Sequence, residues 1–393
     1  MEWKDYRLID VLDALIDYRG KTPKKYNSGV PLITAKIIKN GTIGTPTEFI
    51  AVEDYASWMI RGFPEIGDVV LTTEAPLGEV AQLKSKNIAL AQRVVTLRGK
   101  KGILDNTFLK YFFLSHEGHQ RLVARETGTT VTGIKQSELR EVLITCPSYQ
   151  TQRRIAAILS SLDDKIENNN RINRNLEAQA QALFKSWFVD FEPWGGTMPE
   201  DWKEGTLGEI AVFNKRKVGP KFANPIQYLD TGHLTEGVIE GYQRFYPGDK
   251  IPSSARRYVG EGDILFSLCR PNMRHYGLMM NPPEDIVAST GFAVITANWS
   301  GYRYYIYQWL KQDGIIDNIH AVAEQSSTTY PTIDVDYLAG MTMVIPSIAD
   351  TERYAHLCCD LYSKIESNYQ ESLRLATLRD TLLPKLMKGE VIV

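Results

Sequence analysis

The 393-residue sequence has only four cysteines, and it lacks any run of about 18 uncharged apolar residues that could cross a membrane. Cys146, Cys269, Cys358 and Cys359 show no CxxC spacing, which argues against a structural zinc site. Two of them are adjacent and would form only a strained disulfide, which points to a reducing compartment. The N-terminus also lacks the apolar segment of a secretion signal. These absences predict a soluble, cytoplasmic protein without membrane association.

The sequence also has no large excess of positive or negative charge. Lys and Arg number 45 and Asp and Glu 47, so the formal net charge is −2. This excludes a uniformly basic coat for nucleic acid but leaves room for a local basic surface. Hydrophobic residues make up 43% and aromatic residues 10% of the chain, which excludes disorder as its main state. The length predicts two or three domains.

The sequence does contain a duplication with a period near 199 residues. Trp3-Lys4 recurs as Trp202-Lys203, Pro147-Ser148 as Pro346-Ser347, and Lys165-Ile166-Glu167 as Lys364-Ile365-Glu366. The paired threonines Thr129-Thr130 likewise recur as Thr328-Thr329. A period of this length is far beyond the 20–50 residues of solenoid repeats and indicates a duplicated domain.

Each half of the duplication ends in one long stretch of helical periodicity. Apolar and small polar residues recur at alternating steps of three and four from Leu159 onward, and again 199 residues later from Cys358. Such spacing is typical of a coiled-coil seam, which needs a facing helix. The residues expected to pair the two helices are Leu159, Leu162, Ile166, Asn169, Asn173, Leu176, Leu361, Ile365, Asn368, Leu375 and Leu382.

Asparagines lie at the middle of this seam in both copies. A buried amide is satisfied only opposite another polar group, so Asn169, Asn173 and Asn368 would fix the register of the helix pair. The alternative is that the seam loosens there and leaves these residues exposed. We expect an α+β protein in which two similar mixed α/β domains, at residues 1–148 and 193–347, are separated by two long antiparallel coiled-coil helices, at 149–192 and 348–393. The repeat would then have pseudo-twofold symmetry.

An acid-free, lysine-rich segment opens each half of the chain. Residues 20–47 and 211–229 contain no Asp or Glu. Two domains held at a fixed spacing suit a periodic partner such as duplex DNA, whose turn is about 34 Å. Arg and Asn can read base edges, whereas Lys mostly contacts phosphates. The candidate DNA-binding residues are Lys21, Lys24, Lys25, Lys36, Lys39, Arg93, Lys215, Arg216, Lys217, Lys221, Arg256, Arg257, Arg270, Asn272 and Arg274. The alternative is that they form ordinary solvated faces.

Differences between the two copies are where unlike DNA sequences would be read. Arg270-Pro271-Asn272 in the second copy, aligned with Glu74-Ala75-Pro76 in the first, is the clearest such difference.

Several segments resemble the DNA-specificity subunit of type I restriction–modification systems. Residues 147–155, with Pro147 and Gln152, resemble the family's entry to its first helix, although Thr151 replaces a common Glu. Residues 183–193 are similar to the signature at the exit of that helix, 198–202 to the start of a second target-recognition domain, and 386–391 to the C-terminal ending. The resemblance covers the whole chain.

The resemblance implies a non-enzymatic subunit that binds double-stranded DNA. Each target-recognition domain would read one half of a split, asymmetric target, and the helices would set the gap. The chain would bind two methylation subunits and, through them, restriction subunits. S-adenosylmethionine, ATP and magnesium would belong to those partners, and this chain would hold no cofactor and no metal.

Two motifs suggest chemistry but lack an essential part. Asn281-Pro282-Pro283-Glu284 resembles the catalytic turn of adenine methyltransferases, yet Glu284 cannot stack on a flipped base. His116 and His119 lack a third metal ligand. Two rival functions stay open: a coiled-coil adaptor between proteins that does not bind DNA, and a self-contained modification enzyme. Salt-dependent binding of duplex DNA, by the chain alone or with a methylation subunit, would exclude the adaptor, and methyl transfer by the isolated chain would support the modification enzyme.

Overall fold

The computed structural model describes residues 2–20, 22–128, 132–219, 222–326, 330–391 and 393. Lys21, Lys221 and the two threonine pairs of the repeat lie outside these residues. The chain divides into two compact units, Met1–Asn168 with Ser372–Val393 (unit 1) and Asn169–Glu371 (unit 2). Among the described residues, no helix combines the length and apolar composition needed to span a bilayer.

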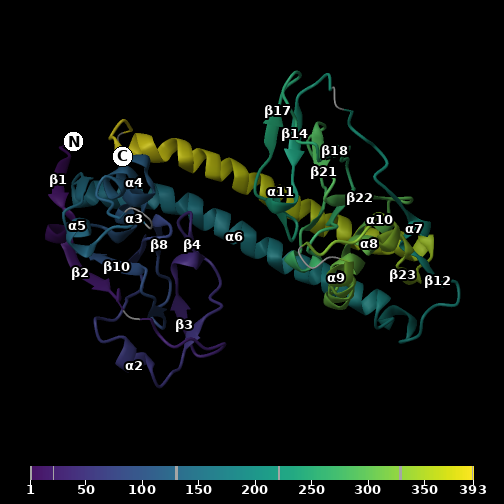
Figure 1. Ribbon diagram of the computed structural model, residues 1–393, viewed down its shortest axis with the longest axis horizontal. Helices are drawn as coiled ribbons and strands as arrows, with labels where there is room; N and C mark the ends of the chain where they lie inside the picture. The colour runs from purple at the N-terminus through teal and green to yellow at the C-terminus, as the bar shows by residue number, and fades with distance from the viewer. Residues whose placement is uncertain (1, 21, 129–131, 220–221, 327–329, 392) are drawn as a thin grey trace. The chain divides into compact units, whose positions relative to one another are not determined.

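Two 40-residue helices, α6 (Tyr149–Phe188) and α11 (Ile348–Met387), are each shared between the units (Figure 1). At 1.5 Å per residue each is about 60 Å long. Both begin after a Pro-Ser pair whose serine hydroxyl accepts a hydrogen bond from the first turn: Thr151 N–H to Ser148 Oγ at 3.3 Å, and Asp350 N–H to Ser347 Oγ at 3.2 Å. Such capping fixes where each helix starts.

Unit 1 contains several small sheets, most of them antiparallel. β1 (Lys4–Arg7) pairs with β11 (Leu143–Cys146). The main sheet has the order β2 (Leu12–Asp17), β10 (Val94–Gly99), β7 (Val69–Thr73), β8 (Leu77–Gln82). A second sheet has the order β6 (Phe49–Ile50), β3 (Val30–Ile33), β9 (Ala89–Leu90), and β4 (Ile38–Lys39) pairs with β5 (Thr42–Ile43). The short helices are α1 (Leu8–Val11), η1 (Ala35–Ile37), α2 (Tyr55–Trp58), α3 (Asn106–Leu114), α4 (His116–Val123) and α5 (Gln136–Arg140).

Unit 2 repeats this plan. β12 (Lys203–Thr206) pairs with β23 (Thr342–Ile345), and the main sheet has the order β13 (Ala211–Phe213), β22 (Phe292–Ala297), β19 (Ile264–Ser267), β20 (Tyr276–Leu278). The second sheet has the order β17 (Gln243–Phe245), β14 (Ile226–Leu229), β21 (Ile286–Ser289), β18 (Ala255–Tyr258), and β15 (Leu234–Thr235) pairs with β16 (Val238–Ile239). The short helices are η2 (Glu192–Trp194), α7 (Leu207–Ile210), η3 (Thr231–His233), η4 (Pro271–Met273), α8 (Tyr302–Leu310), α9 (Asp313–Ser326) and α10 (Val335–Gly340).

The strand registers confirm the internal repeat. Lys4 lies opposite Cys146 in unit 1, and Lys203 lies opposite Ile345 in unit 2, so both members of the pair are displaced by the same 199 residues. The second sheet differs between the units, because β18 of unit 2 is an additional strand beside β21. The mixture of sheets and helices, with two long helices, confirms the expected α+β class.

The long helices belong to the cores of both units. In unit 1, Ile155 and Leu159 of α6 are buried together with Leu383 and Leu386 of α11. In unit 2, Phe184 of α6 is buried together with Tyr354, Cys358 and Tyr362 of α11. Burying one such side chain contributes about 1.5–3 kcal/mol. Each domain is therefore packed onto both helices, and the compact units cut across the ranges predicted from the sequence repeat.

Candidate DNA interface

Two basic segments that lie 40 residues apart in the sequence pair with each other in unit 2. Lys217 lies opposite Arg257 in an antiparallel bridge. The Val218 N–H donates to the Arg256 carbonyl at 2.8 Å, and the Tyr258 N–H donates to the Arg216 carbonyl at 3.1 Å. The pairing therefore creates a strip of positive charge, here named the basic ladder (Lys215–Lys217 with Arg256 and Arg257). Like charges directly opposite on neighbouring strands destabilise a sheet, so this strip is unfavourable in the absence of an anion.

Individual cations of the basic ladder differ in what they contact. Arg216 lies 3.6 Å from Asp263. Lys215 and Lys217 are exposed and form no ion pair within the part of the chain that the structure describes. Arg257 is half-buried, its Nη1 has no hydrogen-bond partner among the described atoms, and burial lowers the pKa of its guanidinium. A buried guanidinium N–H without a partner costs free energy, so an anion bound to the basic ladder would stabilise this part of unit 2.

A second basic feature is the connection between β19 and β20. Arg270 adopts a left-handed conformation (φ 48°), is exposed, and stacks with its guanidinium carbon 5.0 Å from the centre of the Tyr330 ring. Asn272 is also exposed. Arg274, by contrast, forms an ion pair with Asp313 at 2.5 Å, which raises the pKa of its guanidinium. Arg270 and Asn272 are thus accessible to DNA, whereas Arg274 is engaged within unit 2.

The equivalent connection in unit 1 corrects the alignment made from the sequence. Glu74 forms a bridge with Gly133, and Cys269 forms one with Thr332. Because Gly133 and Thr332 are related by the 199-residue repeat, Glu74 corresponds to Cys269 and not to Arg270. Arg270 corresponds to Ala75, which also has a left-handed φ (46°) and also precedes a proline. Pairing Arg270 with Glu74 assumes an offset of 196 residues, whereas the bridged positions Cys269 and Glu74 differ by 195.

The predicted cations of unit 1 are more scattered. Lys25 pairs with Glu48 at 2.9 Å and Arg93 with Glu74 at 3.0 Å. Lys24 is exposed, with its Nζ 5.1 Å from the centre of the Tyr26 ring. Lys36 on η1 and Lys39 on β4 are exposed and without an ion pair inside the described ranges. Lys24, Lys36 and Lys39 are therefore the members of this set that the structure describes as exposed and without an ion pair.

The predicted seam residues of α6 and α11 meet in a polar layer within unit 2. Asn169 Nδ2 donates to Glu371 Oε2 at 2.9 Å, Asn368 Nδ2 to Asn173 Oδ1 at 2.8 Å, and Asn173 Nδ2 to the Ile365 carbonyl at 3.1 Å. Asn169 is 0% and Asn368 2% exposed, so the alternative of exposed asparagines does not hold. Leu159 is buried, and the other apolar members of the predicted set are half-buried: Leu162, Ile166, Leu176, Leu361, Ile365, Leu375 and Leu382.

Two carboxylates on α6, one in each unit, connect the domain of their unit to the long helices. Neither of them was predicted from the sequence. In unit 1, Asp163 accepts hydrogen bonds from Tyr111 (2.5 Å) and Lys110 (3.1 Å) of α3, and from Arg379 (2.8 Å) of α11.

In unit 2, Glu177 accepts hydrogen bonds from Gln308 (2.9 Å) of α8, from Tyr362 (3.0 Å) of α11, and from Lys311. Each network joins three helices and ties the domain of its unit to the segments of α6 and α11 in that unit.

The two motifs that suggest chemistry lie in different units, His116 and His119 in unit 1 and residues 281–284 in unit 2. No group of three or more His, Cys, Asp or Glu side chains is placed to hold a metal ion in the described part of the chain. The Asn281 N–H donates to Glu261 Oε2 at 2.6 Å, and Glu284 is exposed beside a surface pocket.

Known proteins with similar sequences and folds come from several organisms. The family described as "Type I restriction modification DNA specificity domain" matches residues 1–178. The type I restriction enzyme HindI specificity subunit of Haemophilus influenzae is 35% identical over 468 residues, covering 99% of this chain and 100% of that protein. The MjaIX specificity subunit of Methanocaldococcus jannaschii is 28% identical over 414 residues, covering 99% of this chain and 94% of that protein.

A solved structure is similar in fold. The S subunit of the type I restriction–modification system from M. genitalium is 18% identical, with a TM-score of 0.59, and the match covers 98% of this chain and 96% of that one. This likeness supports the repeated two-domain fold. Because the Haemophilus relative is 35% identical along its whole length, the chain belongs to the family of type I restriction enzyme specificity subunits.

Proposed function

We propose that this chain is the sequence-specific DNA-binding subunit of a type I restriction–modification complex. The target-recognition domains of units 1 and 2 each read one half of a bipartite, asymmetric target, and α6 and α11 set the gap between the halves. The observation that carries the proposal is the basic ladder, which holds Lys217 directly opposite Arg257. Such an arrangement is destabilising alone and is favourable against DNA phosphates.

Differences between the units support an asymmetric target. Unit 2 has the extra strand β18, and it carries Arg270 where unit 1 has Ala75. The two domains share the same arrangement of strands but differ in their exposed polar side chains. They would therefore read different DNA sequences.

The long helices offer surfaces for the methylation subunits of the complex. Leu357, Leu373 and Leu378 on α11 are 45%, 45% and 46% exposed, which suits contact with a partner protein. In this proposal the methylation subunits, and restriction subunits bound through them, supply the chemistry together with S-adenosylmethionine, ATP and magnesium. This chain contributes recognition and holds no cofactor of its own.

DNA binding by the isolated chain should fall steeply as salt rises. Between 50 and 200 mM salt we expect a linear fall of log K with log salt concentration, measured by fluorescence anisotropy of a labelled duplex. Lys217→Gln should reduce the magnitude of the slope by about 1, since it removes one phosphate contact. Lys364→Gln, an exposed lysine on α11, is the matched control and should leave the slope unchanged. Absence of any binding by the chain would favour the protein adaptor instead.

A further inference from the structure

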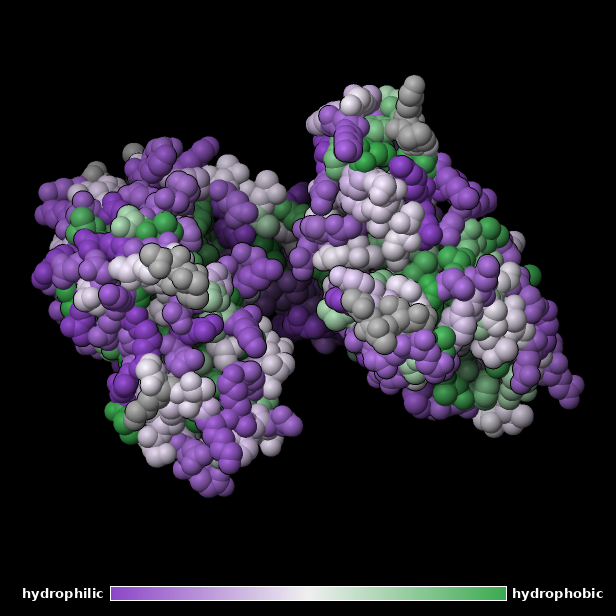
Figure 2. All heavy atoms as spheres, in the orientation of Figure 1, coloured by the Kyte–Doolittle hydropathy of each residue, from purple (hydrophilic) through white to green (hydrophobic). Residues whose placement is uncertain are grey.

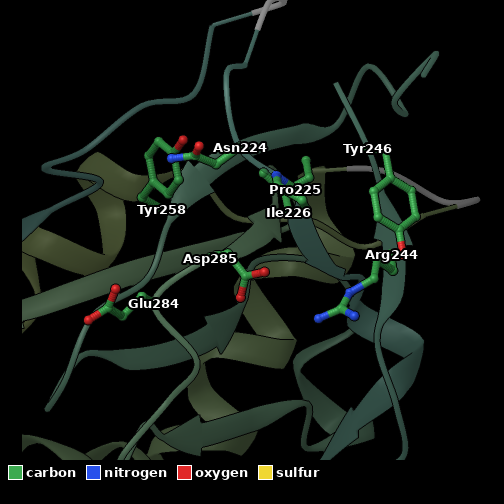
Figure 3. Close-up of a pocket in the computed structure, with 8 residues that line it drawn as sticks. All are labelled: Asn224, Pro225, Ile226, Arg244, Tyr246, Tyr258, Glu284 and Asp285. Carbon is green, nitrogen blue, oxygen red and sulfur yellow. The ribbon is translucent and has the colours of Figure 1, made fainter. Parts of the chain in front are cut away.

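A surface pocket of about 440 Å³ lies at one end of the strands in the second sheet of unit 2. The parallel strands β14 and β21 begin at this end of the sheet, and β17 and β18, which run antiparallel to them, finish there. The pocket is lined by polar and aromatic side chains from all four strand ends and their flanks, including Asn224, Arg244, Tyr246, Tyr258, Glu284 and Asp285 (Figure 3).

Asp285 is held in place by a neighbour on β14. Gln227 Nε2 donates to Asp285 Oδ1 at 2.9 Å, and the Gln227 N–H donates to the Asp285 carbonyl at 2.9 Å. This leaves Asp285 Oδ2 without a hydrogen-bond partner within the described residues. One carboxylate oxygen is therefore oriented and available.

Arg244 lies on β17, the strand that pairs with β14. In the β14–β17 pair Arg244 is directly opposite Gln227, so the two side chains emerge on the same face of the sheet. Arg244 is exposed and forms no ion pair or hydrogen bond in the ranges the structure covers. An arginine and a carboxylate thus face the same pocket without binding one another (Figure 3).

We infer that this pocket reads one G·C base pair in the major groove, with Arg244 donating to guanine O6 and N7 and Asp285 accepting from cytosine N4. The inference rests on the proposed function and adds the chemistry of one position. Arginine reaching two acceptors on one base selects guanine, and a carboxylate accepts the amino group of cytosine. A phosphate would not fit here, because Glu284 and Asp285 would repel it.

The surroundings of the pocket suit entry into a groove. Strands β14, β17, β18 and β21 stand away from α8 and α10 within unit 2 (Figure 1). The major groove is about 12 Å wide and admits a two-stranded β-ribbon, such as the β14–β17 pair that carries Gln227 and Arg244. Tyr246 is 54% exposed at the rim. The face of unit 2 drawn in Figure 2 is mainly hydrophilic, with hydrophobic residues in smaller groups between.

Unit 1 cannot make the same contact. Its corresponding strands β3 and β6 have the sequences VPLI and FI and carry no charged residue. The G·C position would therefore belong to only one half of the target.

Selection from a pool of randomised duplexes by the full-length chain, bound to its methylation subunits, tests the inference. Wild type should select two half-sites. Arg244→Ala and Asp285→Ala should each reduce, by about tenfold or more, the preference for the same single G·C pair. Every other position should keep its preference. Lys250→Gln, an exposed lysine elsewhere in unit 2, is the matched control and should change no position. Thermal melting of each variant checks that it is folded.

Two results for Arg244→Ala itself would overturn the inference while leaving the proposed function intact. One is an unchanged target for Arg244→Ala, and the other is a weakening that is equal across all sequences, which would make Arg244 a phosphate contact. Arg270→Ala provides a reference within the same domain: any position that it alters must lie in the half-site affected by Arg244→Ala, and alteration of the other half-site would also overturn the inference. If wild type selects no sequence at all, the proposed function fails together with the inference.

Discussion

Asp163→Ala is expected to lower the free energy of unfolding by about 3–5 kcal/mol, because it removes one partner from a buried ion pair. The carboxylate joins α3, α6 and α11 in unit 1 through Lys110, Tyr111 and Arg379. The Lys110 side chain is 8% exposed, so its ammonium group would be left buried and uncompensated. Denaturation in urea, followed by circular dichroism, measures the loss.

The adjacent Asp164→Ala is the matched control. Asp164 is exposed on the same helix, and the same substitution there should change the unfolding free energy by no more than about 0.5 kcal/mol. Equal effects of the two substitutions would contradict the role given to the Asp163 network.

The network also predicts how stability depends on pH. Burial alone would raise the pKa of Asp163, but hydrogen bonds from Tyr111, Arg379 and Lys110 more than offset it, so the pKa is lowered. A carboxyl whose pKa is lower in the folded state stabilises above its unfolded value, about 3.9, and loses that contribution as the pH falls through its folded value. The stability difference between wild type and Asp163→Asn should therefore shrink below about pH 4.

Lengthening both long helices together should widen the gap in the DNA target by about nine base pairs. The change is an insertion of three heptads after Arg174 and three after Lys364, which leaves the polar layer and the Glu177 network on their own sides of the insertions. Twenty-one residues add about 31.5 Å, or roughly one turn of DNA, so both domains would meet the same side of the duplex again. The two half-sites themselves should not change.

The selected target of the lengthened protein, compared with that of wild type, measures this effect. Inserting the same 21 residues after Gly102, in an exposed turn of unit 1, is the control and should leave the gap unchanged. An altered half-site with an unaltered gap would refute the idea that α6 and α11 act as a ruler.

Periodic features of the fold could be predicted from the sequence. The 199-residue repeat and the three-four spacing depend only on the order of residues, and both appear in the structure as matched strand registers and as buried or half-buried seam residues. The start of each long helix could also be placed, since a Pro-Ser pair precedes both.

Polar contacts between distant segments could not be predicted. Asp163 and Glu177 lie among many charged residues of a helix, and nothing in the sequence marks them as partners of α3 or α8. Arg244 was missed because it is a single cation on a three-residue strand, and its importance depends on Asp285, 41 positions away. The basic ladder was only partly visible: its two clusters stood out by composition, but their pairing depends on the extra strand β18.

The sites of methylation in DNA modified by the complete complex test the central claim most directly. Base-resolution sequencing of that DNA should show one motif made of two unlike half-sites separated by a fixed number of unspecified base pairs. A single uninterrupted motif, or two identical half-sites, would contradict a protein in which two different domains read DNA from one pair of helices.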